Sequence, residues 1–165
     1  MKSYPLPCFD TFSPAKIITL IQYLKPNWQG FWLHNHGNDV IGILPKMRWV
    51  VSCNPTSSIP PFVLSTHSRT GGTQSTSMTF DDIKHTLITY HQHHLDATIS
   101  TSDTYLHGLM GYISYDISAH ALNPKITLQD TPLAYFGHYD GYLSYRDPHW
   151  HLCVMSDEFF DERQL

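Results

Sequence analysis

Histidines are the most numerous candidates for chemistry, since 12 of the 165 residues are histidine. His91, His93 and His94 lie close together, but ligands on one helical face need separations of three or four residues, so only His91 and His94 could meet. His34 and His36 would share one face of a strand, and with a third ligand from elsewhere they could bind a metal. Both arrangements are weak, and the spacing favours solvated histidines over a metal site.

Nucleophiles and phosphate-binding loops give no stronger signal. No serine lies in a nucleophile elbow, and Cys8, Cys53 and Cys153 have no recognisable catalytic context. Their odd number and wide spacing predict reduced, buried thiols rather than disulfides or a zinc site. Gly71 and Gly72 lack the strand, helix and lysine that accompany a phosphate-binding loop. Taken alone, the residues predict no catalytic residue and no enzyme.

The composition of the chain limits the classes of partner that we expect it to bind. A hydrophobic content of 41% can build the core of a single domain over residues 1–165. The net charge of -4, without a basic stretch, argues against nucleic acid and anionic membranes. No apolar run approaches the roughly 20 residues that span a bilayer, and prolines interrupt the start of the chain where a signal peptide would be apolar. We therefore expect a cytoplasmic protein with no nucleic-acid and no membrane partner.

Two helices are predicted to frame the strands. Ser13 and Pro14 form a helix start, and apolar residues then recur at helical spacing until Pro26. Thr79 is predicted to cap a second helix that runs to about Leu95. A third, short helix is expected near residues 118–122.

Strands are predicted between and after these helices. The expected strand ranges are 31–33, 40–44, 48–53, 62–64, 106–117 and a hairpin of 133–145 with 150–155. Gly108 and Gly111 indicate a strand whose backbone is approached closely by its neighbour. Residues 65–78 have hardly any apolar side chain and are predicted to be a mobile loop. The order of elements predicts an α+β fold, an antiparallel, sandwich-like β-sheet domain with a few flanking helices.

The end of the chain carries an unfinished pattern. Residues 157–165 begin an amphipathic pattern without a capping residue or an apolar face large enough to dock. This pattern leads us to expect a chain cut from a longer protein.

Four segments resemble, in the same order, the amino-terminal domain of component I of aminodeoxychorismate synthase (para-aminobenzoate synthase) and of anthranilate synthase. They are FWLHN at 31–35, WVVSCNP at 49–55, GLMGYISYDISAHAL at 108–122 and PLAYFGHYDGYLSYRDPHWHLCVMS at 132–156. The similarity extends from about residue 13 to residue 156. It implies an amino-terminal, non-catalytic domain of a chorismate-utilising synthase, with the carboxy-terminal chorismate-binding catalytic domain absent.

The resemblance also implies partners. In the complete enzyme, this domain would support its own carboxy-terminal chorismate-binding domain. Chorismate would be aminated with ammonia from a glutamine amidotransferase subunit, towards p-aminobenzoate and folate. No cofactor is expected in this domain, because magnesium belongs to the catalytic domain. The alternatives are the regulatory domain of anthranilate synthase component I, whose Leu-Glu-Ser signature is missing, a free-standing small-molecule binding module and, least favoured, a histidine-based metal hydrolase.

One ligand site is implied by the resemblance, namely part of a tryptophan pocket. The matching residues are Leu33, His34 and Asn35 at the end of a strand, with Lys46, Met47 and Arg48 on the far side. Asn35 replaces the serine of the family and can still form hydrogen bonds with an amino acid. A cation on the far side could bind the carboxylate of the ligand.

Overall fold

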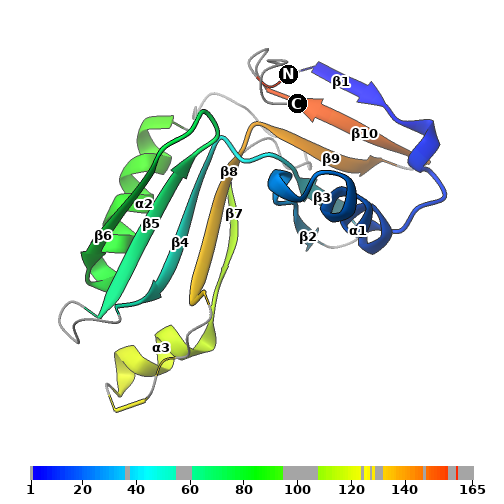
Figure 1. Ribbon diagram of the computed structural model, residues 1–165. Helices are drawn as coiled ribbons and strands as arrows, with labels where there is room; N and C mark the ends of the chain where they lie inside the picture. Colours follow the sequence, from blue (N-terminus) through cyan, green and yellow to red (C-terminus); the bar gives the residue numbers. More distant parts are fainter. Residues whose placement is uncertain are drawn as a thin grey trace. The chain divides into compact units, whose positions relative to one another are not determined.

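The computed structural model contains two five-stranded antiparallel sheets (Figure 1). The structure describes residues 2–35, 38–54, 61–94, 108–123, 125–126, 128, 132–146, 148–155 and 159. The predicted α+β class with antiparallel sheet is confirmed. The chain divides into two compact units where the sequence predicted one domain. Unit 1 comprises Met1–Lys46, Ile99–Met110 and His138–Leu165, and unit 2 comprises Met47–Thr98 and Gly111–Gly137.

Figure 1 labels the α-helices and the strands, which follow one another along the chain. The helices are η1 (Pro7–Phe9), α1 (Pro14–Leu24), η2 (Pro26–Trp28), α2 (Phe80–His94) and α3 (Tyr115–Leu122). The strands are β1 (Lys2–Pro5), β2 (Phe31–Asn35), β3 (Asn38–Gly42), β4 (Met47–Cys53), β5 (Phe62–Ser68), β6 (Thr73–Met78), β7 (Gly108–Ile113), β8 (Ala134–Tyr139), β9 (Gly141–Arg146) and β10 (His149–Val154). Within the described residues, no helix is long and apolar enough to cross a membrane.

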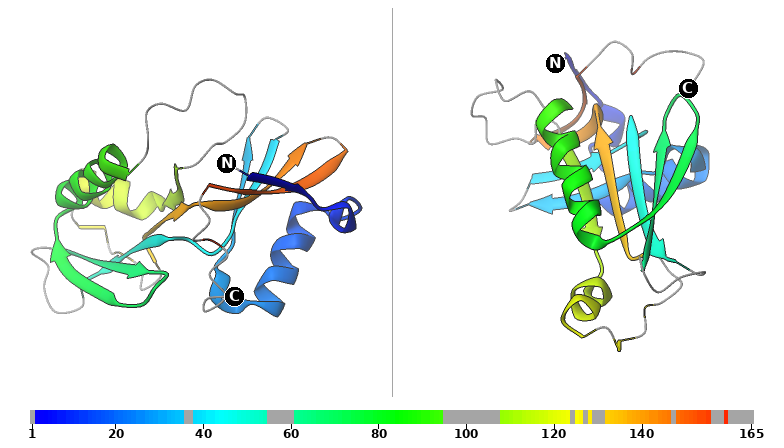
Figure 2. Two further views of the ribbon diagram at one scale, coloured as in Figure 1. Left: turned by 90° about the horizontal axis from the view of Figure 1, so that it is seen from above. Right: turned by 90° about the vertical axis from the view of Figure 1, so that its left-hand side faces the viewer.

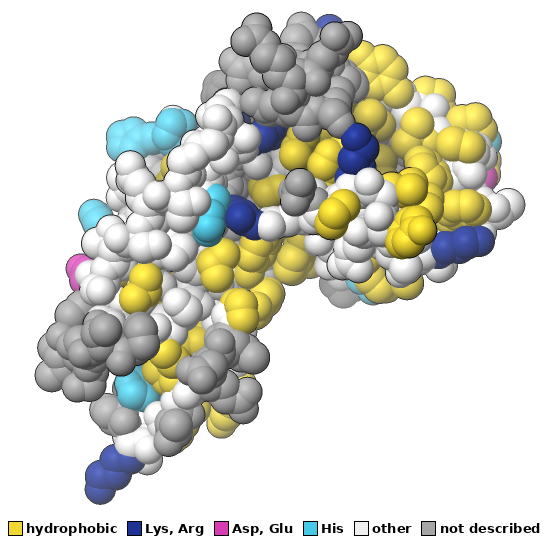
Figure 3. All heavy atoms as spheres, in the orientation of Figure 1, with side chains coloured by type: hydrophobic (Ala, Val, Ile, Leu, Met, Phe, Trp, Pro, Cys, Tyr) yellow, Lys and Arg dark blue, Asp and Glu magenta, His cyan; other side chains and the backbone are white. Residues whose placement is uncertain are grey.

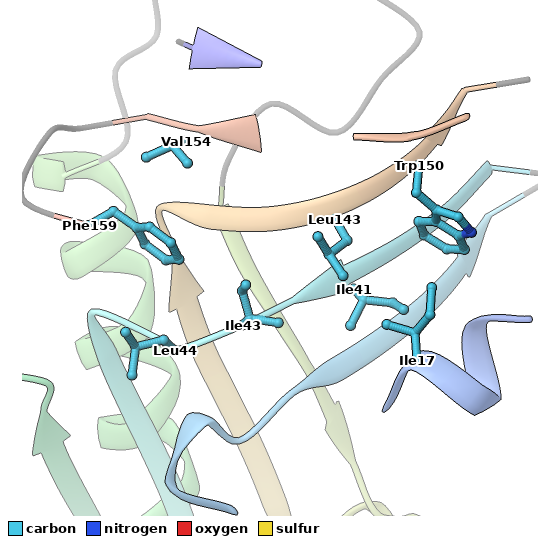
Figure 4. Packing of buried hydrophobic residues seen from close by; sticks show 8 residues of the cluster. All are labelled: Ile17, Ile41, Ile43, Leu44, Leu143, Trp150, Val154 and Phe159. Carbon is cyan, nitrogen blue, oxygen red and sulfur yellow. The ribbon is translucent and has the colours of Figure 1, made fainter. Parts of the chain in front are cut away.

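The sheet of unit 1 has the strand order β1-β10-β9-β3-β2. Helix α1 packs against one face of this sheet and begins where the sequence predicted, because the Ser13 Oγ accepts a hydrogen bond from the Lys16 backbone N–H (3.3 Å). Buried side chains of α1, of the strands and of the segments beside them form one core, drawn in Figure 4. The core residues are Ile17, Ile41, Ile43, Leu44, Leu143, Trp150, Val154 and Phe159.

The opposite face of the same sheet is also covered. Tyr142 and Cys153 lie opposite each other in the β9–β10 hairpin and are fully buried with Tyr139 and Met110. Burial raises the pKa of the Tyr142 hydroxyl well above its ordinary value, and its hydrogen bond with the Cys153 thiol adds to the shift. Gly42 makes this packing possible, because a Cβ there would lie 2.6 Å from the Tyr139 ring.

The sheet of unit 2 has the order β6-β5-β4-β8-β7, and α2 lies along one of its faces (Figure 2). Trp49 of β4 contacts Tyr90 of α2, with 4.6 Å between ring centroids. The helix begins with a reciprocal cap, in which the Asp82 N–H donates to Thr79 Oγ1 (3.2 Å) and the Thr79 N–H donates to Asp82 Oδ2 (3.1 Å). The hydrogen bonds from Thr79, from its side chain first and then from its backbone, lower the pKa of Asp82.

The prediction of a loop over residues 65–78 is wrong. Strands β5 and β6 pair there in an antiparallel hairpin, and Gly71 and Gly72 form its turn with φ values of 107° and 92°. The buried side chains of Phe62 and Leu64 anchor β5, so that β6 is held by ladder hydrogen bonds without burying apolar surface of its own. A polar edge strand therefore formed where composition alone indicated a loop.

The long strand predicted over residues 133–145 is interrupted at Asp140. Strand β8 ends before this residue and belongs to the sheet of unit 2, whereas β9 begins after it and belongs to the sheet of unit 1. The predicted hairpin is confirmed for β9 and β10, which pair antiparallel. All three cysteines are free as predicted, but only Cys153 is buried and Cys8 is exposed.

Candidate functional site

The predicted tryptophan-pocket residues of β2 lie at the tip of the β2–β3 hairpin. Leu33 and His34 are exposed, and Asn35 pairs with Asn38 in the ladder. Asp39 organises this tip, because His34 Nδ1 lies 2.8 Å from its Oδ1 and the Trp32 Nε1–H donates to the same oxygen at 2.8 Å. With Nδ1 directed at the carboxylate, His34 keeps Nε2 for other partners.

Lys46 lies beyond the opposite end of this hairpin. Asn38 is paired with Asn35 at the tip and Gly42 with Phe31 at the base, and Lys46 follows the base. The ladder itself separates tip and base by about 13 Å, at roughly 3.3 Å per residue. The backbone N–H of Lys46 donates to the carbonyl of His138 (2.8 Å). Within unit 1 the structure therefore separates Lys46 from the tip of the hairpin, where Asn35 lies.

Met47 and Arg48 belong to unit 2, at the start of β4. Arg48 lies opposite His67 of β5, and His67 Nδ1 lies 2.9 Å from Thr73 Oγ1 of β6. Burial, and secondly the charge of Arg48, lower the pKa of His67 below its ordinary value. The six predicted pocket residues are thus distributed over two units: Leu33, His34, Asn35 and Lys46 belong to unit 1, and Met47 and Arg48 belong to unit 2. The tryptophan pocket stays a prediction.

The depressed pKa of His67 predicts a pH dependence of stability. Because the folded chain binds a proton at His67 less readily than the unfolded chain, its contribution to stability is intact above the ordinary pKa of 6.5 and is lost as the pH falls from there towards the lower folded pKa. Between about pH 7.5 and about pH 5.5, wild-type protein should lose more stability than the His67→Gln variant in urea titrations. His85→Gln, an exposed position on α2, should follow the wild-type curve; an identical loss in both variants would contradict the assignment.

The described histidines and acidic residues do not assemble a metal centre. In the described part of the chain, no group of three or more His, Cys, Asp or Glu side chains could hold a metal ion. His91, His93 and His94 are exposed at the end of α2, where the ring of His94 lies 4.3 Å from that of Tyr90. His36 lies outside the described residues, so the predicted pair with His34 is not placed.

Five large apolar side chains between residues 112 and 126 of unit 2 are exposed. They are Tyr112 and Ile113 of β7, Tyr115 and Leu122 of α3, and Ile126. Ile126 is held beside α3, because its N–H donates to the Asn123 carbonyl (3.0 Å) and its own carbonyl lies 3.0 Å from His120 Nδ1. We call these five side chains the β7–α3 surface.

The exposure of this surface is large. Tyr115 and Leu122 are 83% and 90% exposed, although Ile117 and Ala119 of the same helix are buried against unit 2. Strand β7 also ends the strand order, so its outer backbone edge lies next to these side chains. Contiguous exposed apolar patches mark sites of protein association, and these exposed side chains are candidates for such a patch. The sequence predicted a strand over residues 106–117 and a helix near 118–122, whereas the strand ends at Ile113 and the helix already begins at Tyr115. It did not predict that these apolar side chains would be exposed.

Comparison with known proteins gives no family for the chain. No protein-family model matches it, and no curated protein matches it in sequence.

Proposed function

We propose that this chain is the non-catalytic amino-terminal domain of a chorismate-utilising synthase of the aminodeoxychorismate synthase component I type. In this role its β7–α3 surface docks onto the chorismate-binding catalytic domain. The observation that carries the proposal is the exposure of large apolar side chains in residues 108–122, one of the four segments that resemble the family. Four of the five side chains of the β7–α3 surface, Tyr112, Ile113, Tyr115 and Leu122, belong to this segment.

The chemistry of the described residues fits a supporting role. The three acidic residues that the structure describes in unit 1, Asp39, Asp140 and Asp10, have separate surroundings and do not form a pair poised for acid and base catalysis. Asp39 is engaged by Trp32 and His34, Asp140 is buried, and Asp10 lies 2.6 Å from His149 Nδ1. We therefore assign chorismate, magnesium and ammonia transfer from the glutamine amidotransferase subunit to the partner domains.

The exposed apolar side chains of β7 and α3 support docking through these two elements. An interface needs a central group of large side chains that become fully desolvated, and aromatic residues are enriched among those that dominate affinity. Tyr115 and Leu122 provide such side chains on a helix whose inner face is anchored by Ile117. The Tyr112 hydroxyl is already satisfied by the Pro132 carbonyl (3.1 Å), so covering its ring would leave that hydroxyl with a partner. We place the assembled enzyme in the cytoplasm, where the three free cysteines would stay reduced.

A docking titration tests the proposal. The chain is titrated by calorimetry with the separately expressed chorismate-binding domain of an aminodeoxychorismate synthase component I. Tyr115→Asp and Leu122→Asp should each weaken binding at least about tenfold, because a carboxylate would be buried in an apolar interface. Tyr23→Asp is the matched control, since Tyr23 of α1 is also 83% exposed but belongs to unit 1.

Three results would contradict the proposal. The first is no binding by the wild-type chain, and the second is equal weakening by Tyr23→Asp and Tyr115→Asp. The third is turnover of chorismate with ammonia and magnesium by the chain alone, above a control without protein, because product would require a catalytic site within these residues.

A further inference from the structure

Strand β6 leaves one backbone edge of the unit 2 sheet open. It ends the strand order on the side away from β7, and no described strand pairs with its outer edge. All of its residues except Met78 are exposed. Figure 3 shows the surface over β5 and β6 largely in white, the colour of side chains that are neither apolar nor charged.

The ladder between β5 and β6 fixes which backbone groups point outwards. Ser68 donates its N–H to the Gly72 carbonyl (3.3 Å), so the hydrogen-bonded pairs alternate from that point along the hairpin. In consequence Gln74 and Thr76 direct their backbone groups at β5, whereas those of Thr73, Ser75 and Ser77 point to the open edge. The short side-chain contact between Ser65 Oγ and Ser75 Oγ (2.9 Å) is typical of the closely spaced, non-hydrogen-bonded pairs.

Among the described residues, this edge lacks the features that usually prevent pairing between molecules. Edge strands are commonly protected by lysine, proline, a bulge or a covering segment. Strand β1, at the edge of the unit 1 sheet, begins with Lys2 and ends with Pro5. The sequence of β6, TQSTSM, contains neither a charge nor a proline, and its register with β5 is continuous. The sheet therefore offers a regular row of donors and acceptors that a further strand can use.

We propose that β6 pairs antiparallel with β6 of a second copy of this chain, about a twofold axis at Ser75. In this register Ser75 faces Ser75 of the second copy and Thr73 faces Ser77, so every outward backbone group has a partner. The hydroxyl side chains that meet across the axis are small and uncharged, so that no like charges oppose the contact.

Charge complementarity favours a second copy as the occupant of this edge. Arg69, in the β5–β6 turn, and Asp81, at the start of α2, each lie six residues from Ser75 in opposite directions. In the twofold register, the β5–β6 turn of one copy, which contains Arg69, lies at the same end of the contact as the start of α2 of the other copy, which contains Asp81. The Asp81 side chain is 87% exposed and its present partner is the surface residue Lys84. The same pair of opposite charges occurs at both ends of the contact.

Sedimentation of the full chain tests the pairing. The wild-type chain should be dimeric at about 100 µM, and Ser75→Pro should weaken dimerisation at least about tenfold, because proline removes an outward N–H but none of the ladder with β5. Ser75→Ala keeps the N–H and should remain dimeric. Ser75→Lys, which keeps the strand but places two like charges at the axis, should also be monomeric, and circular dichroism establishes that each variant is folded.

Charge-reversal variants and amide hydrogen exchange test whether the dimer forms through β6 in the proposed register. Arg69→Asp and Asp81→Arg should each weaken the dimer, and the double variant should restore it.

In the dimer, the amides of Thr73, Ser75 and Ser77 should gain protection as the protein concentration rises. A monomeric wild-type chain, a dimer that survives both Ser75→Pro and Ser75→Lys, or protection of those amides only when a different protein is added would overturn the proposal. Because Tyr115→Asp lies outside this contact, it should leave the dimer intact, which separates this inference from the docking of the catalytic domain.

Discussion

Replacing Trp150 with alanine is expected to lower the free energy of unfolding by about 3–5 kcal/mol. The indole is 1% exposed in the core of unit 1, and its Nε1–H donates to the Phe12 carbonyl (3.2 Å). Its ring also packs edge-on against Tyr145, with 5.4 Å between centroids. Truncation would open a cavity beneath the sheet and remove the donor of the Phe12 carbonyl. A domain is typically stabilised by about 5–15 kcal/mol in total, so this loss is a large part of it.

Urea unfolding followed by far-ultraviolet circular dichroism measures this effect. Trp150→Phe retains an aromatic ring but loses the N–H donor, so its loss should be intermediate. Trp32→Ala is the control for removing a tryptophan, because Trp32 is 42% exposed and leaves no closed cavity. Equal losses in Trp150→Ala and Trp32→Ala would show that the core of unit 1 does not depend on the buried indole.

Local signals in the sequence were sufficient for the starts of α1 and α2, whereas α3 begins at Tyr115, inside the strand predicted over residues 106–117. Ser13 with Pro14, and Thr79 with Asp82, carry hydrogen-bonding and conformational preferences that act within one turn, and α1 and α2 begin where these residues predict. Strand β4 was likewise predicted almost to its bounds, because its β-branched and aromatic residues alternate around a buried Trp49 and Val51. These elements are decided by neighbours in the sequence.

Features decided by distant neighbours were not predicted. Strand β6 has no apolar face, and its backbone is held by β5, whose own Phe62 and Leu64 are buried. The alternation of side chains over residues 133–145 did not indicate that the chain passes at Asp140 from β8, in the sheet of unit 2, to β9, in the sheet of unit 1. Pairing partners supply the stabilisation in both cases, and a composition argument that considers each segment alone omits them.

The candidate site was predictable only in part for the same reason. The resemblance selected Leu33 to Asn35 and Lys46 to Arg48, but the boundary between the two compact units falls between Lys46 and Met47. Conversely, the sequence identified residues 108–122 as important without showing which of their side chains would be covered. Tyr115 and Ile117 are both apolar positions near the start of one short helix, yet one is 83% exposed and the other is fully buried. Exposure follows from the orientation of α3 on its sheet, which no local pattern encodes.

The glycine pattern in β7 gave a more specific expectation, a backbone approached closely by its neighbour, and it is confirmed at Gly111. A Cβ at Gly111 would overlap the carbonyl oxygen of Tyr135 in β8 and lie 2.8 Å from the Cα of Phe136. Both contacts are with backbone, which cannot move aside as the end of a flexible side chain can. A side chain here must therefore displace β7 from β8 and weaken the pairing between them.

Gly111→Ala is accordingly expected to lower the free energy of unfolding by about 1–3 kcal/mol, and Gly111→Val by more, because the added volume meets a packed strand. Gly30→Ala is the matched control, since a Cβ at Gly30 would have its nearest neighbour, Ile18 Cδ1, at 3.4 Å, an ordinary contact. Urea unfolding gives the size of the loss, and amide hydrogen exchange locates it, with faster exchange expected in β7 and β8 and little change in β9 and β10. If Gly111→Ala were as stable as Gly30→Ala, the close approach of the β8 backbone would not constrain this position, and the glycine would have to be explained by the conformation of β7 alone.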